Sequence, residues 1–141
     1  MKRIISSILF VGMLLVPAIG SQKVDNLMVI VTTDDSLTQL MAGVLALQSK
    51  QQGANVEMLF CGKAGDLVIK GSKEVKLKPK GISPQMLIKK LLLLGANVGV
   101  CPPYLPNASK TKNDLISGVK IVKPPKVASR ILDKNTKILS Y

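Results

Sequence analysis

The feature that most constrains the fold is a series of short, continuously apolar runs separated by segments with helical spacing. The first run, residues 26–33 (NLMVIVTT), is rich in β-branched residues and lacks the alternation of a strand with one wet face. Such runs are typical of strands buried on both faces, and the segments between them are long enough for crossover helices. The sequence therefore predicts an α/β fold, a flavodoxin-like three-layer α/β/α sandwich with a mostly parallel five-stranded sheet.

The expected elements alternate along the chain. Strands are predicted at residues 26–33, 54–61, 96–101, 119–122 and 137–141, and helices at residues 37–52, 86–94, 113–117 and 125–133. Ser36 with Gln39 fits a capping box for the first helix, and Ser83 followed by Pro84 fits the start of the second. The Gly- and Lys-rich stretch between them, residues 62–81, is expected to hold a small hairpin with strands at 66–70 and 74–78.

The N-terminus has the layout of a cleavable signal peptide. A short basic start, Lys2 and Arg3, precedes an apolar run that is too short for a comfortable membrane span, and small residues precede a cut after Gly20. We therefore expect a signal peptide at residues 1–20, an exported and periplasmic mature domain at 21–141 (secreted as the alternative), and no stable membrane insertion after cleavage. An uncleaved anchor is the competing interpretation.

Charge and composition limit the function classes. The chain carries 20 Lys and Arg against 8 Asp and Glu, for a formal charge of +12, which falls to +10 when the signal peptide is removed. Export and the scarcity of aromatic residues argue against nucleic acid, so small anions become the expected partners. The chain has no His, which excludes histidine-based triads and the zinc sites that need imidazole. No metal and no cofactor are expected, and the remaining candidate chemistry is that of thiols.

Two cysteines end two predicted strands. The tetrapeptide Gly-Ala-Asn-Val occurs at residues 53–56 and 95–98, each time turning from a helix into a strand that runs to Cys61 or Cys101. Both thiols should therefore lie at the carboxyl edge of the sheet, where open α/β sheets bind ligands. Lys110 and Lys112 follow Cys101 and would stabilise its thiolate. Cys61 lies in a more apolar run and is interpreted as a structural, secondary thiol.

Whether the two cysteines bridge depends on the strand order. If their strands are neighbours, the Cα atoms lie about 5 Å apart and a disulfide is feasible. If the first strand lies between them, the separation is roughly 10 Å and no bridge forms. The sequence leaves both arrangements open.

The residues at the end of the first strand partly match two other kinds of site. Asp34 and Asp35 resemble half of the acidic pocket of receiver domains, but a third acid is missing and capping of the next helix is favoured. The hydroxyl-rich loop 32–38 lacks the glycine of a flavin-phosphate loop and carries two carboxylates. Nucleotide binding is therefore not expected.

Taken together, the mature chain resembles the DsrE/DsrF-like sulfur-relay family, particularly its small exported members. The resemblance covers most of residues 26–141 and is strongest in the Gly-Ala-Asn-Val-Gly-Val-Cys segment 95–101. Further matching segments are the turn after the first strand, the helix end at Gly53, strand residues 56–60, and the motifs at 81–83, 104–105, 114–115 and 118–119. The resemblance implies a flavodoxin-like fold, a homo-oligomer, and Cys101 as a residue that carries sulfur as a persulfide.

The sequence thus leads to two main function hypotheses. The first is a sulfur carrier or transferase in which Cys101 takes sulfane sulfur from a small sulfur anion and passes it to an acceptor thiol, with Lys110, Lys112 and Tyr104 as substrate-binding residues. The second is a non-catalytic oligomeric module that binds a small anion or a protein partner at the same edge. A thiol–disulfide redox protein using Cys61 and Cys101 is the third alternative, although the chain has no Cys-x-x-Cys motif.

Overall fold

A single parallel sheet organises the computed structural model, which describes residues 26–141. Its strands are β1 (Asn26–Val31), β2 (Asn55–Phe60), β3 (Asn97–Val100), β4 (Lys120–Ile121) and β5 (Thr136–Ser140). Their order is β4-β3-β2-β1-β5, and every neighbouring pair is parallel. The predicted α/β sandwich with a five-stranded parallel sheet is confirmed. The signal-peptide prediction lies outside the described residues.

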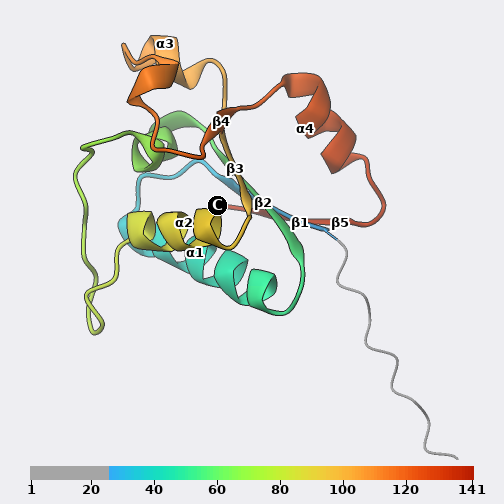
Figure 1. The fold of residues 1–141 in the computed structure, drawn as a ribbon, viewed down its shortest axis with the longest axis horizontal. Coiled ribbons are helices and arrows are strands. Elements are labelled where there is room, and N and C mark those ends of the chain that lie inside the picture. The colour runs from blue at the N-terminus through green and yellow to red at the C-terminus, as the bar shows by residue number, and fades with distance from the viewer. Residues whose placement is uncertain (1–25) are drawn as a thin grey trace, which may run out of the picture.

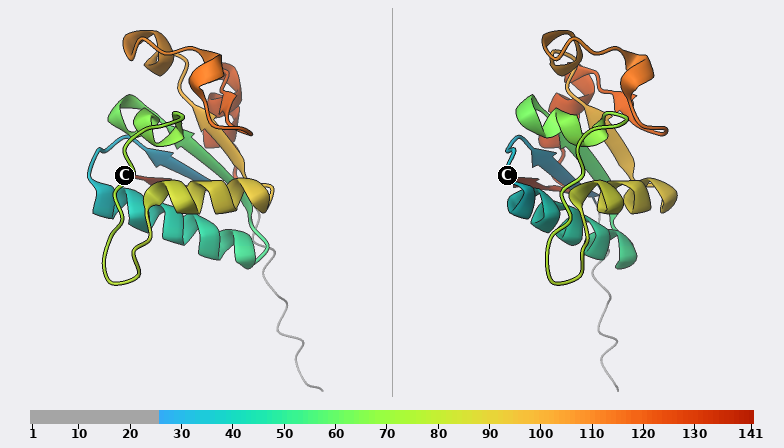
Figure 2. Two further views of the ribbon diagram at one scale, coloured as in Figure 1. Left: turned by 60° about the vertical axis from the view of Figure 1, so that its left-hand side comes forward. Right: turned by 90° about the vertical axis from the view of Figure 1, so that its left-hand side faces the viewer.

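The helices form the outer layers (Figures 1 and 2). From β1 to β4 the chain moves steadily across the sheet, so right-handed crossovers place α1 (Ser36–Gln51) and α2 (Pro84–Leu93) on one face. The connection from β4 returns past β1 to β5 and places α4 (Pro124–Ile131) on the opposite face. The short elements η1 (Gly62–Val68), α3 (Tyr104–Asn107) and η2 (Lys112–Asp114) follow the strand ends.

The main core lies between the sheet and the helices α1 and α2. Alternate side chains of β1, such as Val29 and Val31, belong to it together with Phe60 from β2 and Leu91 from α2, and all four are almost fully buried. In contrast, no residue of α4 is buried. The two faces of the sheet are therefore covered unequally. The helix α4 leaves part of the sheet face on its side accessible.

Local signals explain most element boundaries. The turn from helix to strand is the same at both copies of the Gly-Ala-Asn-Val tetrapeptide, with positive φ at Gly53 (93°) and Gly95 (75°). After each glycine, the backbone N–H of Ala54 or Ala96 donates to a carbonyl of the preceding helix. The prediction for α2 is confirmed, since the Ser83 side chain caps it and Pro84 is its first residue.

The capping-box prediction for α1 is wrong by one residue. Asp35 is the N-cap, and its carboxylate accepts a hydrogen bond from the Thr38 N–H at 2.7 Å, while Ser36 is already helical. A carboxylate is an equally good cap and carries the charge that a helix N-terminus favours. The capping role expected for the acidic pair is therefore confirmed for Asp35.

The segment predicted as a hairpin has a different structure. Residues 62–68 form the 3-10 helix η1, whose apolar side chains, including Leu67 and Val68, are buried against the domain. Burial of these side chains outweighs the turn tendency of the glycines. Farther on, the short helix expected at 113–117 is replaced by η2, and the helix α3 forms directly after the proline pair.

None of the helices in residues 26–141 combines the length and the apolar character required to cross a membrane.

Candidate functional site

The sheet brings the two cysteines together. Phe60 of β2 and Val100 of β3 are register partners, so the residues that follow them are also neighbours. Cys61 and Cys101 have Cα atoms 5.1 Å apart and form a disulfide bond. Of the two strand orders left open by the sequence, the structure has the one in which the cysteine strands are adjacent.

Main-chain hydrogen bonds fix both cysteines at the end of the sheet. The N–H of Cys61 donates to the carbonyl of Val31 at 3.0 Å, and the N–H of Cys101 donates to the carbonyl of Phe60 at 2.9 Å. These bonds continue the ladder one residue past the strands. The thiol positions therefore depend on the sheet itself and not only on the S–S bond.

An open pocket of about 570 Å³ lies against the disulfide. Both cysteines are partly accessible, and the other walls come from η1 and α3. The remaining lining residues are Gly62, Lys63, Asp66, Pro103, Tyr104, Asn107 and Ala108. The pocket lies at the carboxyl edge of the sheet, where ligands bind in folds of this class.

A hydrogen bond between η1 and α3 closes one side of this pocket. The Tyr104 hydroxyl donates to a carboxylate oxygen of Asp66 at 2.5 Å, and the ring packs on Gly65 so closely that a Cβ there would overlap it. Burial raises the pKa of the Tyr104 phenol above its ordinary value of 10, and the hydrogen bond and negative charge of Asp66 raise it further. Tyr104 is therefore a neutral hydrogen-bond donor at any physiological pH.

The predicted substrate-binding residues are only partly gathered. Tyr104 lines the pocket, but Lys110 and Lys112 are not among its lining residues. Lys110 instead lies near Asp114, whose carboxylate has its pKa lowered mainly by hydrogen bonds from Thr111 and less by this lysine. The lysine that lines the pocket is Lys63, two residues after Cys61.

The sequence does not predict Lys63, Asp66 or Asn107 as site residues. It predicts a loop at Lys63 and a hairpin strand at Asp66, and it predicts no helix at Asn107. A usable signal was present, because both segments follow strand-end cysteines and residues after parallel strands gather at one edge. The described residues contain no group of three metal-ligating His, Cys, Asp or Glu side chains.

Comparison with known proteins supports the fold. No family model and no curated protein matches the chain. Among solved structures, the chain is similar to the ychN protein from E. coli, with a TM-score of 0.67 and 19% identity over 82% of this chain and 99% of that one. It is also similar to MTH1491, a protein of unknown function from Methanobacterium thermoautotrophicum (TM-score 0.61, 14% identity, 83% and 98% covered).

A third similar structure is BT1422, a conserved protein of unknown function from Bacteroides thetaiotaomicron (TM-score 0.58, 22% identity, 82% and 95% covered). All three matches extend over nearly the whole of the other chain. At these identities the likeness establishes a shared fold and leaves the chemistry to be argued from the residues of this chain.

Proposed function

We propose that this chain is an exported, homo-oligomeric DsrE-like sulfur carrier in which Cys101 holds sulfane sulfur as a persulfide and Cys61 resolves it. The observation that carries the proposal is the pair of strand-end cysteines, with Cα atoms 5.1 Å apart beside an open pocket. Two cysteines in this arrangement can pass reversibly between a dithiol and a disulfide. Two features support export. The predicted signal peptide would direct the chain out of the cytoplasm, and a disulfide such as Cys61–Cys101 persists in oxidising compartments.

The loading step requires the reduced protein. The Cys101 thiolate attacks the sulfane sulfur of a small sulfur anion such as thiosulfate, the S–S bond of the donor breaks, and sulfite leaves with the electron pair. The product is a Cys101 persulfide. No general base is needed because a thiolate is itself the nucleophile. Lys63 lines the pocket and favours the approach of an anion.

The release step follows one of two routes. An external acceptor thiolate can attack the outer sulfur of the persulfide and regenerate the Cys101 thiolate. Alternatively, the Cys61 thiolate attacks the Cys101 sulfur, hydrosulfide leaves, and the Cys61–Cys101 disulfide forms. An external dithiol then reduces this disulfide and is itself oxidised, which completes the cycle.

The test is intact-mass analysis of the reduced protein after treatment with thiosulfate or polysulfide. We expect Cys61→Ser to retain one added sulfur atom, because the resolving thiol is missing. The wild type should release sulfide in an amount equal to the disulfide formed, and Cys101→Ser should take up no sulfur. Failure of both the wild type and Cys61→Ser to take up sulfur or release sulfide would overturn the carrier proposal for these donors.

Thiol–disulfide exchange is the second candidate, and the disulfide itself favours it. A redox protein of this kind would exchange electrons with a dithiol such as reduced thioredoxin and show no sulfur uptake in the same mass experiment. The non-catalytic binding module remains the alternative if neither reaction occurs. Its signature would be anion or partner binding at this pocket that survives the Cys61→Ser/Cys101→Ser double substitution.

A further inference from the structure

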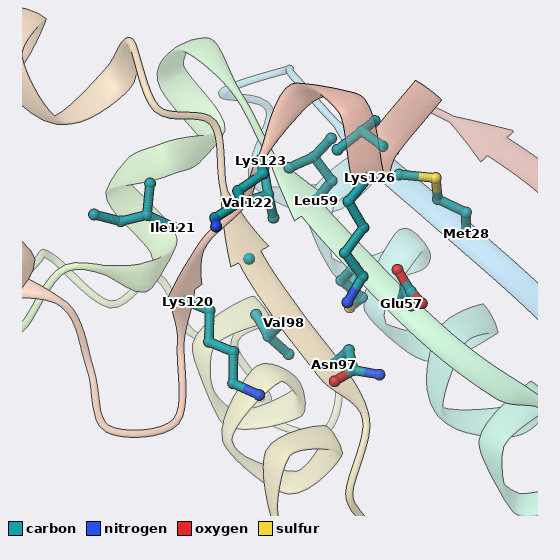
Figure 3. Close-up of a pocket in the computed structure, with 13 residues that line it drawn as sticks. Met28, Glu57, Leu59, Asn97, Val98, Lys120, Ile121, Val122, Lys123 and Lys126 are labelled. Carbon is teal, nitrogen blue, oxygen red and sulfur yellow. The ribbon is translucent and has the colours of Figure 1, made fainter. Parts of the chain in front are cut away.

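A second cavity lies on the opposite side of the sheet from α1 and α2. It has a volume of about 240 Å³ and is enclosed by the middle of the sheet, the strand β4 and the helix α4 (Figure 3). It shares no lining residue with the pocket beside the cysteines. Any ligand bound there is therefore independent of the sulfur chemistry proposed above.

The floor of this cavity is apolar. Met28 from β1 and Leu59 from β2 form part of it and are only 3% and 5% exposed. At Gly99 of β3 the missing side chain leaves room for Val122, since a Cβ at this glycine would overlap the valine side chain. The floor thus offers buried hydrocarbon to the apolar part of a ligand.

The rim of the cavity is basic. Lys120 belongs to β4, Lys123 is the N-cap residue of α4, and Lys126 lies in the first turn of α4. Figure 3 shows Lys120 and Lys126 extending along two sides of the hollow, with Asn97 beside them. None of the three lysines forms a salt bridge within residues 26–141.

The single carboxylate of the cavity does not neutralise this rim. Glu57 is paired with Arg130 of α4 at 2.8 Å, and this ion pair also holds α4 to the sheet. The charge of Glu57 is therefore already compensated by Arg130, and the ammonium groups of Lys120 and Lys126 beside the hollow have no salt-bridge partner among residues 26–141. An anion is the complementary partner for this rim.

We propose that this cavity binds a small organic anion with an apolar body, specifically a short- or medium-chain carboxylate. The hydrocarbon part would lie on the floor around Leu59, and the carboxylate would meet Lys120 and Lys126. The volume is above that of a cavity of ~150 Å³ that holds benzene and below the ~300 Å³ at which drug-sized sites begin. A chain or single ring of modest length fits this range, whereas a large cofactor does not.

The experiment is a titration of the isotope-labelled protein with octanoate, followed by NMR chemical shifts. Octanol has the same chain without the charge, and acetate has the charge without the chain. We expect saturable binding of octanoate, with chemical-shift changes at β3, β4 and α4. Octanol and acetate should each bind at least about tenfold more weakly, which corresponds to a loss of about 1.4 kcal/mol when either the charge or the chain is missing. Equal binding of acetate or of octanol would overturn the proposal.

Variants separate the roles of charge and shape. Lys120→Gln and Lys126→Gln should each weaken octanoate binding by about two- to fivefold, the range for a solvent-exposed ion pair. Lys76→Gln, in the loop before α2, makes the same charge change far from the cavity and should have no effect. Val127→Trp fills the cavity from the exposed helix α4 and should abolish binding while the protein stays folded.

Retention of octanoate binding in the Val127→Trp variant would contradict the assigned location. A second copy of the chain covering this face is the competing occupant. In that case Lys126→Gln, but not Lys76→Gln, would change the oligomeric state seen by sedimentation, while octanoate would cause no saturable shifts. That result would also overturn the proposal.

Discussion

Replacing Tyr104 by Phe tests the contact that closes the cysteine pocket. The substitution removes only the hydroxyl, which donates a hydrogen bond to Asp66 at 2.5 Å, and keeps the ring that packs on Gly65. The affected contact joins η1 to α3, the two short elements that follow the strand-end cysteines. The change therefore isolates one polar interaction without opening a cavity.

The expected magnitude follows from the surroundings of the two groups. A hydrogen bond to a charged partner contributes about 1.5–3 kcal/mol. Asp66 is exposed, so its carboxylate can be solvated by water when the phenol is gone, whereas the Tyr104 side chain is 9% exposed. We therefore expect a loss near the lower limit, about 1.5 kcal/mol in the free energy of unfolding.

A pH signature distinguishes this contact from simple loss of packing. The pKa of Tyr104 is raised in the folded protein, so its contribution is complete below the ordinary phenol pKa of 10. Above pH 10 the unfolded state ionises at this residue and the folded state does not, so stability falls as pH rises. The Tyr104→Phe variant should lack this alkaline decline.

Urea unfolding at neutral and alkaline pH measures both effects. At neutral pH the midpoint should drop by about 1 M for a protein of this size. The matched control is Tyr141→Phe, which removes a hydroxyl from the other, only partly buried tyrosine and should shift the midpoint by less. An unchanged midpoint together with an unchanged alkaline decline in Tyr104→Phe would refute the reasoning.

Three further predictions concern stability. Reducing the Cys61–Cys101 bond, which closes a loop with a sequence separation of 40, should lower the free energy of unfolding by about 4 kcal/mol on the chain-entropy model; equal urea midpoints for oxidised and reduced protein would contradict this. Gly65→Ala forces a Cβ into the tyrosine ring beside it and should cost about 1–3 kcal/mol, seen as a lower melting temperature. The hydrogen bond from the backbone N–H of Asn135 is the main cause that holds the pKa of Asp133 below 3.8. The Asp133 carboxylate therefore stabilises the fold above pH 3.8, and this stabilisation is lost as the pH falls further. In Asp133→Asn, the free energy of unfolding should fall less steeply between neutral and acidic pH.

The sheet and its main helices were predictable because their signals are local. Continuous apolar runs and the glycine turns at Gly53 and Gly95 fix where strands begin and helices end. The segment 62–81 was not predictable in the same way. Its glycines and lysines suggest a hairpin, but η1 is held by contacts with residues far along the chain. The Tyr104 ring packs on Gly65 within η1, and Ile69, directly after η1, forms a bridge with Leu115.

The site shows the same division between local and long-range information. Each cysteine ends a predicted strand, and parallel strands end at the same edge of a sheet. The sequence therefore predicts that both cysteines lie at the carboxyl edge. That they touch depends on the strand order, which no local pattern encodes. Their closeness to Cys101 in sequence predicts Lys110 and Lys112 as site residues, but the chain through α3 places them outside the lining of the pocket. Lys63 lies there instead.

The sheet gives a reason to expect the thiol pair to work in both redox states. In a Cys-x-x-Cys motif one short turn positions both sulfurs, whereas here each cysteine ends its own strand. We expect the N–H of Cys61 to stay bonded to Val31 and that of Cys101 to Phe60 when the S–S bond opens, because these hydrogen bonds belong to the parallel ladder. Reduction should therefore remove a cross-link and leave the two strand ends aligned. A persulfide formed on Cys101 would then have Cys61 within reach from the start, which is the condition for resolution inside one chain rather than by a second protein.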